Sequence, residues 1–197
     1  MNRASAAAIG FLMVAVAARA APVPTHLMPK GDPICYPIVV GDKSVHQLAN
    51  GEITFTVTKV EKLDGRYRVT LDAADSSTNA KYSQTSIVSP LGVELVEHGS
   101  LKVEPSIWWV KLPHAENNAW SSVWTPTGTK YNFKTTGWEI VEVPAGRIRA
   151  VRVERAETQD GNDLGTTVYW YAPRYGCIKI TGRSPARSMK SFTPGKE

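Results

Sequence analysis

The side chains that most often do chemistry in proteins are few in this chain and stand far apart. Its histidines are His26, His46, His98 and His114. No two are separated by the two or four residues at which paired histidines commonly bind zinc. Residues Asp160–Gly165 resemble the start of a calcium loop, but Leu164 occupies the position of a third oxygen ligand. We therefore expect no metal site, and a polar hairpin loop at 160–165.

Motifs for nucleophilic catalysis and phosphate binding do not stand out either. The chain has no Gly-x-Ser-x-Gly elbow and no glycine-rich phosphate loop, and Cys177 has no base near it in sequence. The sequence thus predicts no catalytic residue and no cofactor. A hydrolase of the cell envelope, with catalytic residues dispersed along the chain, is the remote alternative. A serine or cysteine hydrogen-bonded to one of the histidines in a cleft would favour that alternative.

Aromatic side chains are the most distinctive feature of the C-terminal half. The candidate ligand-binding residues are Trp108, Trp109, Trp120, Trp124, Trp138, Tyr169, Trp170 and Tyr171. In strands, adjacent Trp108 and Trp109 would face opposite sides of the sheet, and Tyr169 and Tyr171 would share the face opposite Trp170. Either these rings form the core, or some line a concave sheet that holds an apolar or glycan ligand.

Two further groups of residues have ordinary structural interpretations. Cys35 and Cys177 would meet oxidising conditions if the chain is exported, so they can form a disulfide that closes a very long loop, or remain two buried thiols. The arginine cluster at 147–155 follows Glu139 and Glu142 across a turn, which favours cross-strand ion pairs on a solvated face.

The two ends of the chain differ in composition from its middle. Residues 1–20 have the basic start, apolar run and Ala18-Arg19-Ala20 site of a signal peptide. The alternative is an uncleaved anchor, although the apolar run is short for a membrane span. Residues 21–33 contain four prolines and predict an extended tether. We expect an exported protein, periplasmic or extracellular, with no integral membrane segment after cleavage.

The formal net charge of +5 does not indicate a nucleic-acid partner. Two of the positive charges, Arg3 and Arg19, belong to the signal peptide. Most of the remaining excess lies in residues 182–197, which predict a basic, disordered tail. A nucleic-acid-binding domain usually carries its basic excess on the folded surface instead.

Residues 34–181 predict one β domain. Apolar side chains alternate at Ile53, Phe55 and Val57, and again from Tyr67 to Leu71, with the turn former Asp64-Gly65 between them. The further predicted strands are 81–88, 92–97, 107–112, 120–125, 137–143, 147–154, 166–172 and 176–181. In the 147–154 segment the apolar phase changes, which favours a β-bulge over a short helix. The predicted fold is mostly β, a single curved antiparallel sheet (half-barrel), with a β-sandwich as the alternative.

Two stretches resemble the signatures of a bacterial exported domain family of unknown function. They are Val141–Val151, which contains V-P-A-G, and Tyr169–Lys179, which contains Y-W-Y-A-P-R-Y-G. The chain departs from the family pattern at Ile148, where an aromatic is usual, and at Arg174 and Tyr175, where Gly-Val is usual. The resemblance spans about Trp120 to Thr181. It implies a curved half-barrel like that of periplasmic lipoprotein carriers, with a hydrophobic concave side and no established catalytic residue.

The hypothesis that follows is an exported, non-enzymatic domain that binds an apolar or lipid-like ligand on a concave, aromatic-lined sheet. The alternative is a structural or interaction module of the cell envelope, with an envelope protein as its partner and all the rings in the core.

Overall fold

The computed structural model describes residues 34–112 and 117–196, and this part of the chain contains twelve strands and no helix. Within it there is accordingly no helix long and apolar enough to cross a membrane. The strands are β1 (Lys43–Leu48), β2 (Gly51–Leu63), β3 (Arg66–Asp75), β4 (Lys81–Ser89), β5 (Gly92–His98), β6 (Leu101–Lys111), β7 (Ala119–Trp124), β8 (Thr129–Val143), β9 (Gly146–Gln159), β10 (Asn162–Ala172), β11 (Gly176–Gly182) and β12 (Arg187–Thr193).

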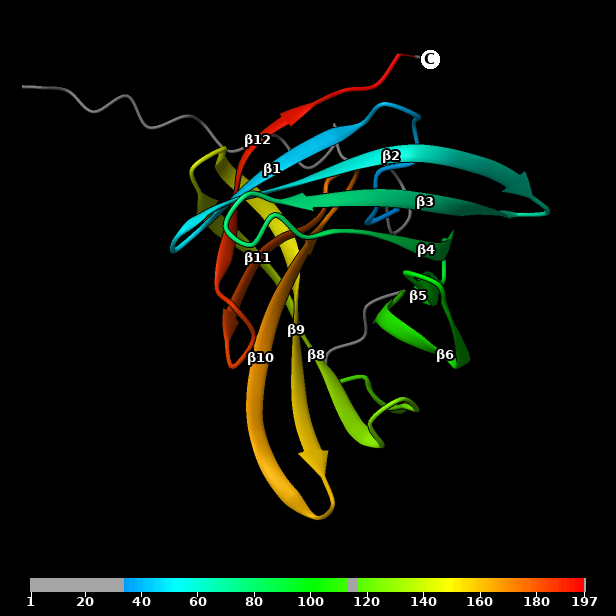
Figure 1. Ribbon diagram of the computed structural model, residues 1–197, viewed down its shortest axis with the longest axis vertical. Helices are drawn as coiled ribbons and strands as arrows, with labels where there is room; N and C mark the ends of the chain where they lie inside the picture. The colour runs from blue at the N-terminus through cyan, green and yellow to red at the C-terminus, as the bar shows by residue number, and fades with distance from the viewer. Residues whose placement is uncertain (1–33, 113–116, 197) are drawn as a thin grey trace, which may run out of the picture. The chain divides into compact units, whose positions relative to one another are not determined.

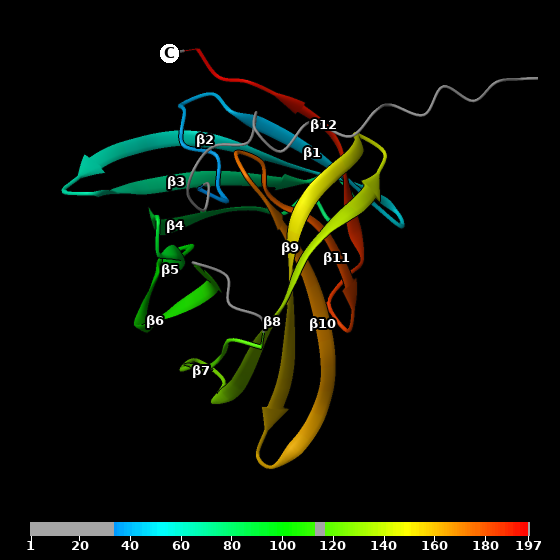
Figure 2. The ribbon, with the colours of Figure 1, turned by 180° about the vertical axis from the view of Figure 1, so that it is seen from behind.

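All twelve strands belong to one antiparallel sheet in the order β6-β5-β4-β3-β2-β1-β12-β11-β10-β9-β8-β7. Each half is a run of hairpins, and the first and last strands join the halves, with Val45 opposite Ser191. Figure 1 shows β2, β3 and β4 running across the direction of β9 and β10, and Figure 2 shows the same crossing from behind. The prediction of a single curved antiparallel sheet is confirmed, and the β-sandwich alternative is wrong.

The two edge strands approach each other because the sheet curls further than a half-barrel. β6 and β7 are not neighbours in the hydrogen-bonded order. The Trp120 indole of β7 nevertheless donates a hydrogen bond of 2.9 Å to the Trp108 carbonyl of β6. One seam therefore stays unsealed between these edges, and a side chain bridges it.

The hairpin predicted around Asp64-Gly65 is present as β2 and β3. Leu63 pairs with Arg66, and Gly65 has φ 64°, a left-handed conformation that glycine adopts without a steric penalty. Pro144 and Ala145 likewise form the tight end between β8 and β9. Arg174, where the resembled family has glycine, also adopts a left-handed φ of 68° in the turn after β10.

The change of apolar phase at 147–154 has a different cause from the predicted bulge in that segment. The side chains of β9 point to alternate faces of the sheet without interruption. The register shift lies in the neighbouring strand β8, between Thr135 and Gly137. Ala150 packs in a small cluster with Val141 and Met189, whereas Val151 packs in the main core. The segment is apolar in both phases because both of its faces are buried.

The C-terminal residues correct another prediction. Residues 182–197 were expected to form a disordered tail, but Arg187–Thr193 form β12, which pairs with β1 and β11. Met189 is 1% exposed and packs against Ala172 and Ile178. The sequence did not predict this strand because Met189 is its one buried side chain and basic residues lie on either side of it. The predicted signal peptide and tether, residues 1–33, lie outside the described residues.

Met189→Ala tests whether β12 is part of the folded core. The deletion leaves a cavity beside Ala172 and Ile178, so we expect the free energy of unfolding in urea to fall by about 2–4 kcal/mol. Ser191→Ala, at an exposed position of the same strand, should change it by less than about 0.5 kcal/mol. Equal, negligible effects of both substitutions would mean that the strand is dispensable.

Candidate functional site

The chain segment before β1 lies inside the sheet and helps to enclose a cavity. Tyr36 is buried, and its hydroxyl contacts Ser86 Oγ at 3.3 Å and accepts a hydrogen bond of 3.1 Å from Gln84 Nε2. Gly41 N–H donates to the Val57 carbonyl at 2.8 Å, which fixes the segment against β2. The cavity between this segment and the sheet has a volume of about 170 Å³.

Aromatic rings form much of the cavity wall. Three of the eight predicted ligand-binding residues line it, namely Trp109, Tyr169 and Tyr171. The Trp109 and Tyr169 ring centroids are 6.3 Å apart, and those of Tyr169 and Tyr171 are 6.2 Å apart in a stacked arrangement. Side chains from β6 and β10, distant in sequence, thus share one wall.

The other predicted aromatic residues have different surroundings. Trp120 is buried and stacks on Phe133 at 5.2 Å, and Trp108 packs at the edge of the same core. Trp124 meets His98 edge to face, and Trp138 lies 5.0 Å from the Arg149 guanidinium. These four rings do not line the cavity.

Trp170 faces away from the cavity. It packs in the cluster around Ala172 and Met189, whereas its neighbours Tyr169 and Tyr171 belong to the main core, as the alternation of a strand requires. The Trp170 indole donates to Glu139. Ligand binding by any of the eight aromatic residues stays a prediction.

Several cavity residues had no signal in the sequence. Tyr36, His46, Phe55 and Arg187 come from the segment before β1 and from β1, β2 and β12, which were not assigned to a site. Phe55 alone belonged to a predicted strand. Tyr36 and His46 precede the first predicted strand, and Arg187 lay in the predicted tail. Their convergence depends on β1 pairing with β12 across almost the whole length of the chain.

The cysteines are both present as thiols, so the disulfide stays a prediction. Cys35 is buried in the main core, and Cys177 packs against the same core and lines the cavity. Burial raises the pKa of the Cys177 thiol, although Arg187 opposes the shift. A thiol held in its protonated form is a weak nucleophile.

The tyrosines around the cavity also remain protonated. Burial raises the pKa of Tyr169 to about 12, and it raises the pKa of Tyr36 and Tyr171 as well. Their hydroxyls therefore act as neutral hydrogen-bonding groups. Among the described residues, no group of three or more His, Cys, Asp or Glu side chains could hold a metal ion.

A serine and a histidine meet at the cavity wall. Ser44 Oγ and His46 Nε2 are 3.2 Å apart, and both residues are buried. His46 Nδ1 is buried with no hydrogen-bond partner within the described ranges, so no carboxylate orients the ring. Burial, with a smaller effect of Arg187, lowers the pKa of His46 to about 3. At neutral pH the ring is thus a weak base.

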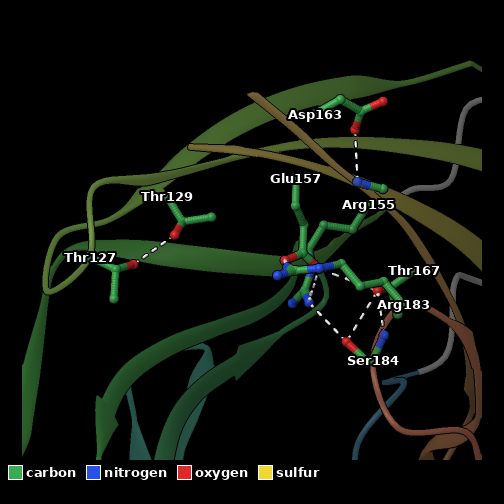
Figure 3. Close-up of polar contacts among 9 residues, drawn as sticks. Thr127, Thr129, Arg155, Glu157, Asp163, Thr167, Arg183 and Ser184 are labelled. Carbon is green, nitrogen blue, oxygen red and sulfur yellow. Dashed lines mark hydrogen bonds and ion pairs between the residues drawn. The ribbon is translucent and has the colours of Figure 1, made fainter. Parts of the chain in front are cut away.

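Behind the aromatic wall lies a buried ion pair that corrects the prediction for one arginine of the 147–155 cluster, because Arg155 was expected on a solvated face. Arg155 and Glu157 are 7% and 4% exposed, and Arg155 Nη2 is 2.6 Å from Glu157 Oε1. Arg183 pairs with the other Glu157 oxygen, and Thr167 and Ser184 complete the network. Figure 3 shows these five side chains converging from β9, β10 and the segment that follows β11.

This network supports the cavity wall through Arg155. Its guanidinium carbon lies 5.6 Å from the Trp109 ring centroid and 5.0 Å from that of Tyr169. A guanidinium over an aromatic face attracts the ring and restrains its position. The rings of Trp109 and Tyr169 are therefore held from behind by a charged group that Glu157 neutralises.

Glu157→Gln should destabilise the protein by about 3 kcal/mol, because it leaves two arginine charges, one of them buried, without their carboxylate. Chemical denaturation at pH 7 measures the change. Glu154→Gln is the matched control on the same strand: it breaks a half-exposed pair with Arg152 and should cost less than about 1 kcal/mol. Similar costs for the two variants would contradict a special role for the buried pair.

Comparisons with known proteins identify the fold. No family model matches the chain, and no curated protein matches it. A solved structure of a protein described as exported, with a YmcC-like fold, from Bacteroides fragilis aligns with 82% of this chain and 100% of its own, with a TM-score of 0.57 and 9% identity. A protein described as a lipoprotein, from Parabacteroides distasonis, covers 83% of this chain and 100% of its own, with a TM-score of 0.52 and 12% identity. At these identities the likeness shows the fold alone: the chain shares it with one solved protein described as exported and with another described as a lipoprotein.

Proposed function

We propose that the protein is an exported, non-enzymatic domain that binds a small apolar or amphipathic ligand in the cavity of its curled sheet. The observation that supports this most is the cavity itself, with Trp109, Tyr169 and Tyr171 on one wall. Apolar cavities with a few polar groups are the usual form of a small-molecule site. The predicted signal peptide at 1–20 supports export, as do the descriptions of the two solved neighbours.

The volume narrows the class of ligand. A cavity of about 150 Å³ lined by apolar side chains is enough to hold a benzene molecule. The 170 Å³ cavity therefore suits one ring or a short acyl chain better than a complete lipid or a glycan. A purely structural envelope module would have no need of such a space, so the cavity favours the ligand-binding hypothesis over that alternative.

Fluorobenzene is a suitable neutral probe, and ¹⁹F NMR of the probe measures its binding to the whole mature protein. We expect saturable binding with a Kd of about 1 mM or tighter, which corresponds to about −4 kcal/mol. Trp109→Leu should weaken binding at least fivefold because it removes part of the wall.

Trp170→Leu is the control, since this ring lies on the opposite side of β10. It should leave the Kd of fluorobenzene unchanged. An absence of saturable binding by the wild-type protein, or equal losses in the two variants, would exclude the proposed site.

A hydrolase is the second candidate because of the contact between Ser44 and His46. A general base works best with a pKa near the working pH and with a partner that orients its ring. His46 has neither property, and Asp42 does not supply the partner, since its carboxylate accepts hydrogen bonds from the Val39 and Gly195 amides. The geometry thus favours binding over hydrolysis.

The titration of His46 separates the two candidates. Its folded pKa lies near 3 and its unfolded value near 6.5, so the unfolded state binds the extra proton between these values and stability falls as the pH is lowered through this window. Between pH 7 and pH 4.5 the wild type should lose about 2.5 kcal/mol more than His46→Leu in urea unfolding. A folded-state pKa of 6 to 7, measured by NMR on the His46 ring, would favour the hydrolase candidate over the binding function.

A further inference from the structure

Arg187 places a positive charge at the cavity. It pairs in register with Ile180, which belongs to the main core, and cross-strand partners project to the same face of a sheet. Its guanidinium carbon lies 4.7 Å from the Phe55 ring centroid, and both residues line the cavity. The arginine thus enters from the strand that the sequence predicted to be a tail.

No carboxylate within the described ranges forms an ion pair with Arg187. Its guanidinium packs over the Phe55 ring and acts electrostatically on the Cys177 thiol, and its Nε is buried without a hydrogen-bond partner in the described part of the chain. Arg155, the other arginine near the cavity wall, is neutralised by Glu157. A partly buried guanidinium without a carboxylate is unusual, because buried charges are normally paired.

The other described groups that line the cavity do not neutralise the charge of Arg187. Asp42 is the one acidic residue that lines it in the described part of the chain, and its two oxygens are engaged by the Val39 and Gly195 amides, at 3.2 and 2.9 Å. His46 is neutral at physiological pH, so it adds no second positive charge. Burial raises the pKa of Tyr36 and Cys177 and lowers that of His46, and the positive charge of Arg187 opposes the first two shifts and adds to the third.

We propose that the cavity selects a compact carboxylate: an apolar body about the size of one ring, packed against Trp109, Tyr169 and Tyr171, with its carboxylate on the guanidinium of Arg187. This inference rests on the proposed function and adds the charge of the ligand. A single guanidinium suits a planar monoanion, which it can bind through two parallel hydrogen bonds. A phosphate dianion would need a second cation, and Arg187 is the one arginine or lysine among the described residues that line the cavity.

The experiment compares three fluorinated probes with wild-type protein by ¹⁹F NMR at pH 7.5: 4-fluorobenzoate, its neutral analogue 4-fluorobenzamide, and fluorobenzene. We expect wild-type protein to bind the benzoate at least tenfold more tightly than the benzamide. Arg187→Met, which keeps an unbranched apolar stem but removes the guanidinium and its charge, should bring the two probes within about twofold of each other. Fluorobenzene should still bind the Arg187→Met protein saturably, because the aromatic wall of Trp109, Tyr169 and Tyr171 remains.

Lys190→Met is the control for the loss of a positive charge from β12, because Lys190 is exposed and pairs with Glu52 at the surface. It should retain the tenfold preference. If fluorobenzene binds the wild type but benzoate and benzamide bind equally, the carboxylate inference fails and the proposed binding function stands. If 4-fluorophenyl phosphate binds more tightly than the benzoate, the monoanion is wrong, and if no probe binds, both proposals fail.

Discussion

A sheet that curls on itself must cover its concave face with its own side chains and flanking segments, because no helix or second sheet among the described residues packs against it. Here the segment before β1 enters that space with Tyr36, and Trp109, Tyr169 and Tyr171 fill much of the remainder. The filling leaves a cavity of about 170 Å³. The position of the cavity, its aromatic walls and the presence of β12 side chains in its lining all follow from this constraint.

Polar groups inside such a sheet need partners, and the two arginines near the cavity differ in the partners they have. Arg155 is matched by Glu157, Thr167 and Ser184, so its role is to hold two aromatic rings in place. Within residues 34–112 and 117–196, Arg187 contacts the Phe55 ring and acts on the Cys177 thiol but pairs with no carboxylate. The charge of Arg155 is therefore already neutralised within the fold, whereas Arg187 can still bind an anionic group. The difference distinguishes the wall of the cavity from the point at which a ligand charge would be recognised.

Local sequence patterns predicted most of the strands, because alternating side chains and turn residues act over a few positions. Asp64-Gly65 and Pro144-Ala145 fixed two hairpins in this way. The strands that escaped prediction, β1 and β12, depend on pairing between distant segments. Their buried residues are few and mostly polar, Ser44 and His46 in β1 and Met189 in β12. The phase change at Ala150 and Val151 was likewise ambiguous, since a strand buried on both faces loses its alternation.

The candidate site was only partly predictable for the same reason. Aromatic composition pointed to Trp109, Tyr169 and Tyr171, and strand alternation separated Tyr169 and Tyr171 from Trp170. Composition could not separate the rings that line the cavity from Trp120, which stacks on Phe133 in the core. Arg187 and His46 reach the cavity through the pairing of β12 with β1, which no local pattern encodes. Arg155 was assigned to a solvated face because its position within a basic cluster resembles that of exposed neighbours.

The cavity is the central claim of this account, and a crystal of the mature protein under xenon pressure tests it most directly. Xenon occupies dry apolar cavities of this size without requiring any particular functional group. We expect anomalous density for xenon between Tyr36, Trp109 and Tyr171. A crystal structure in which these rings pack against one another, with no xenon between them, would contradict it.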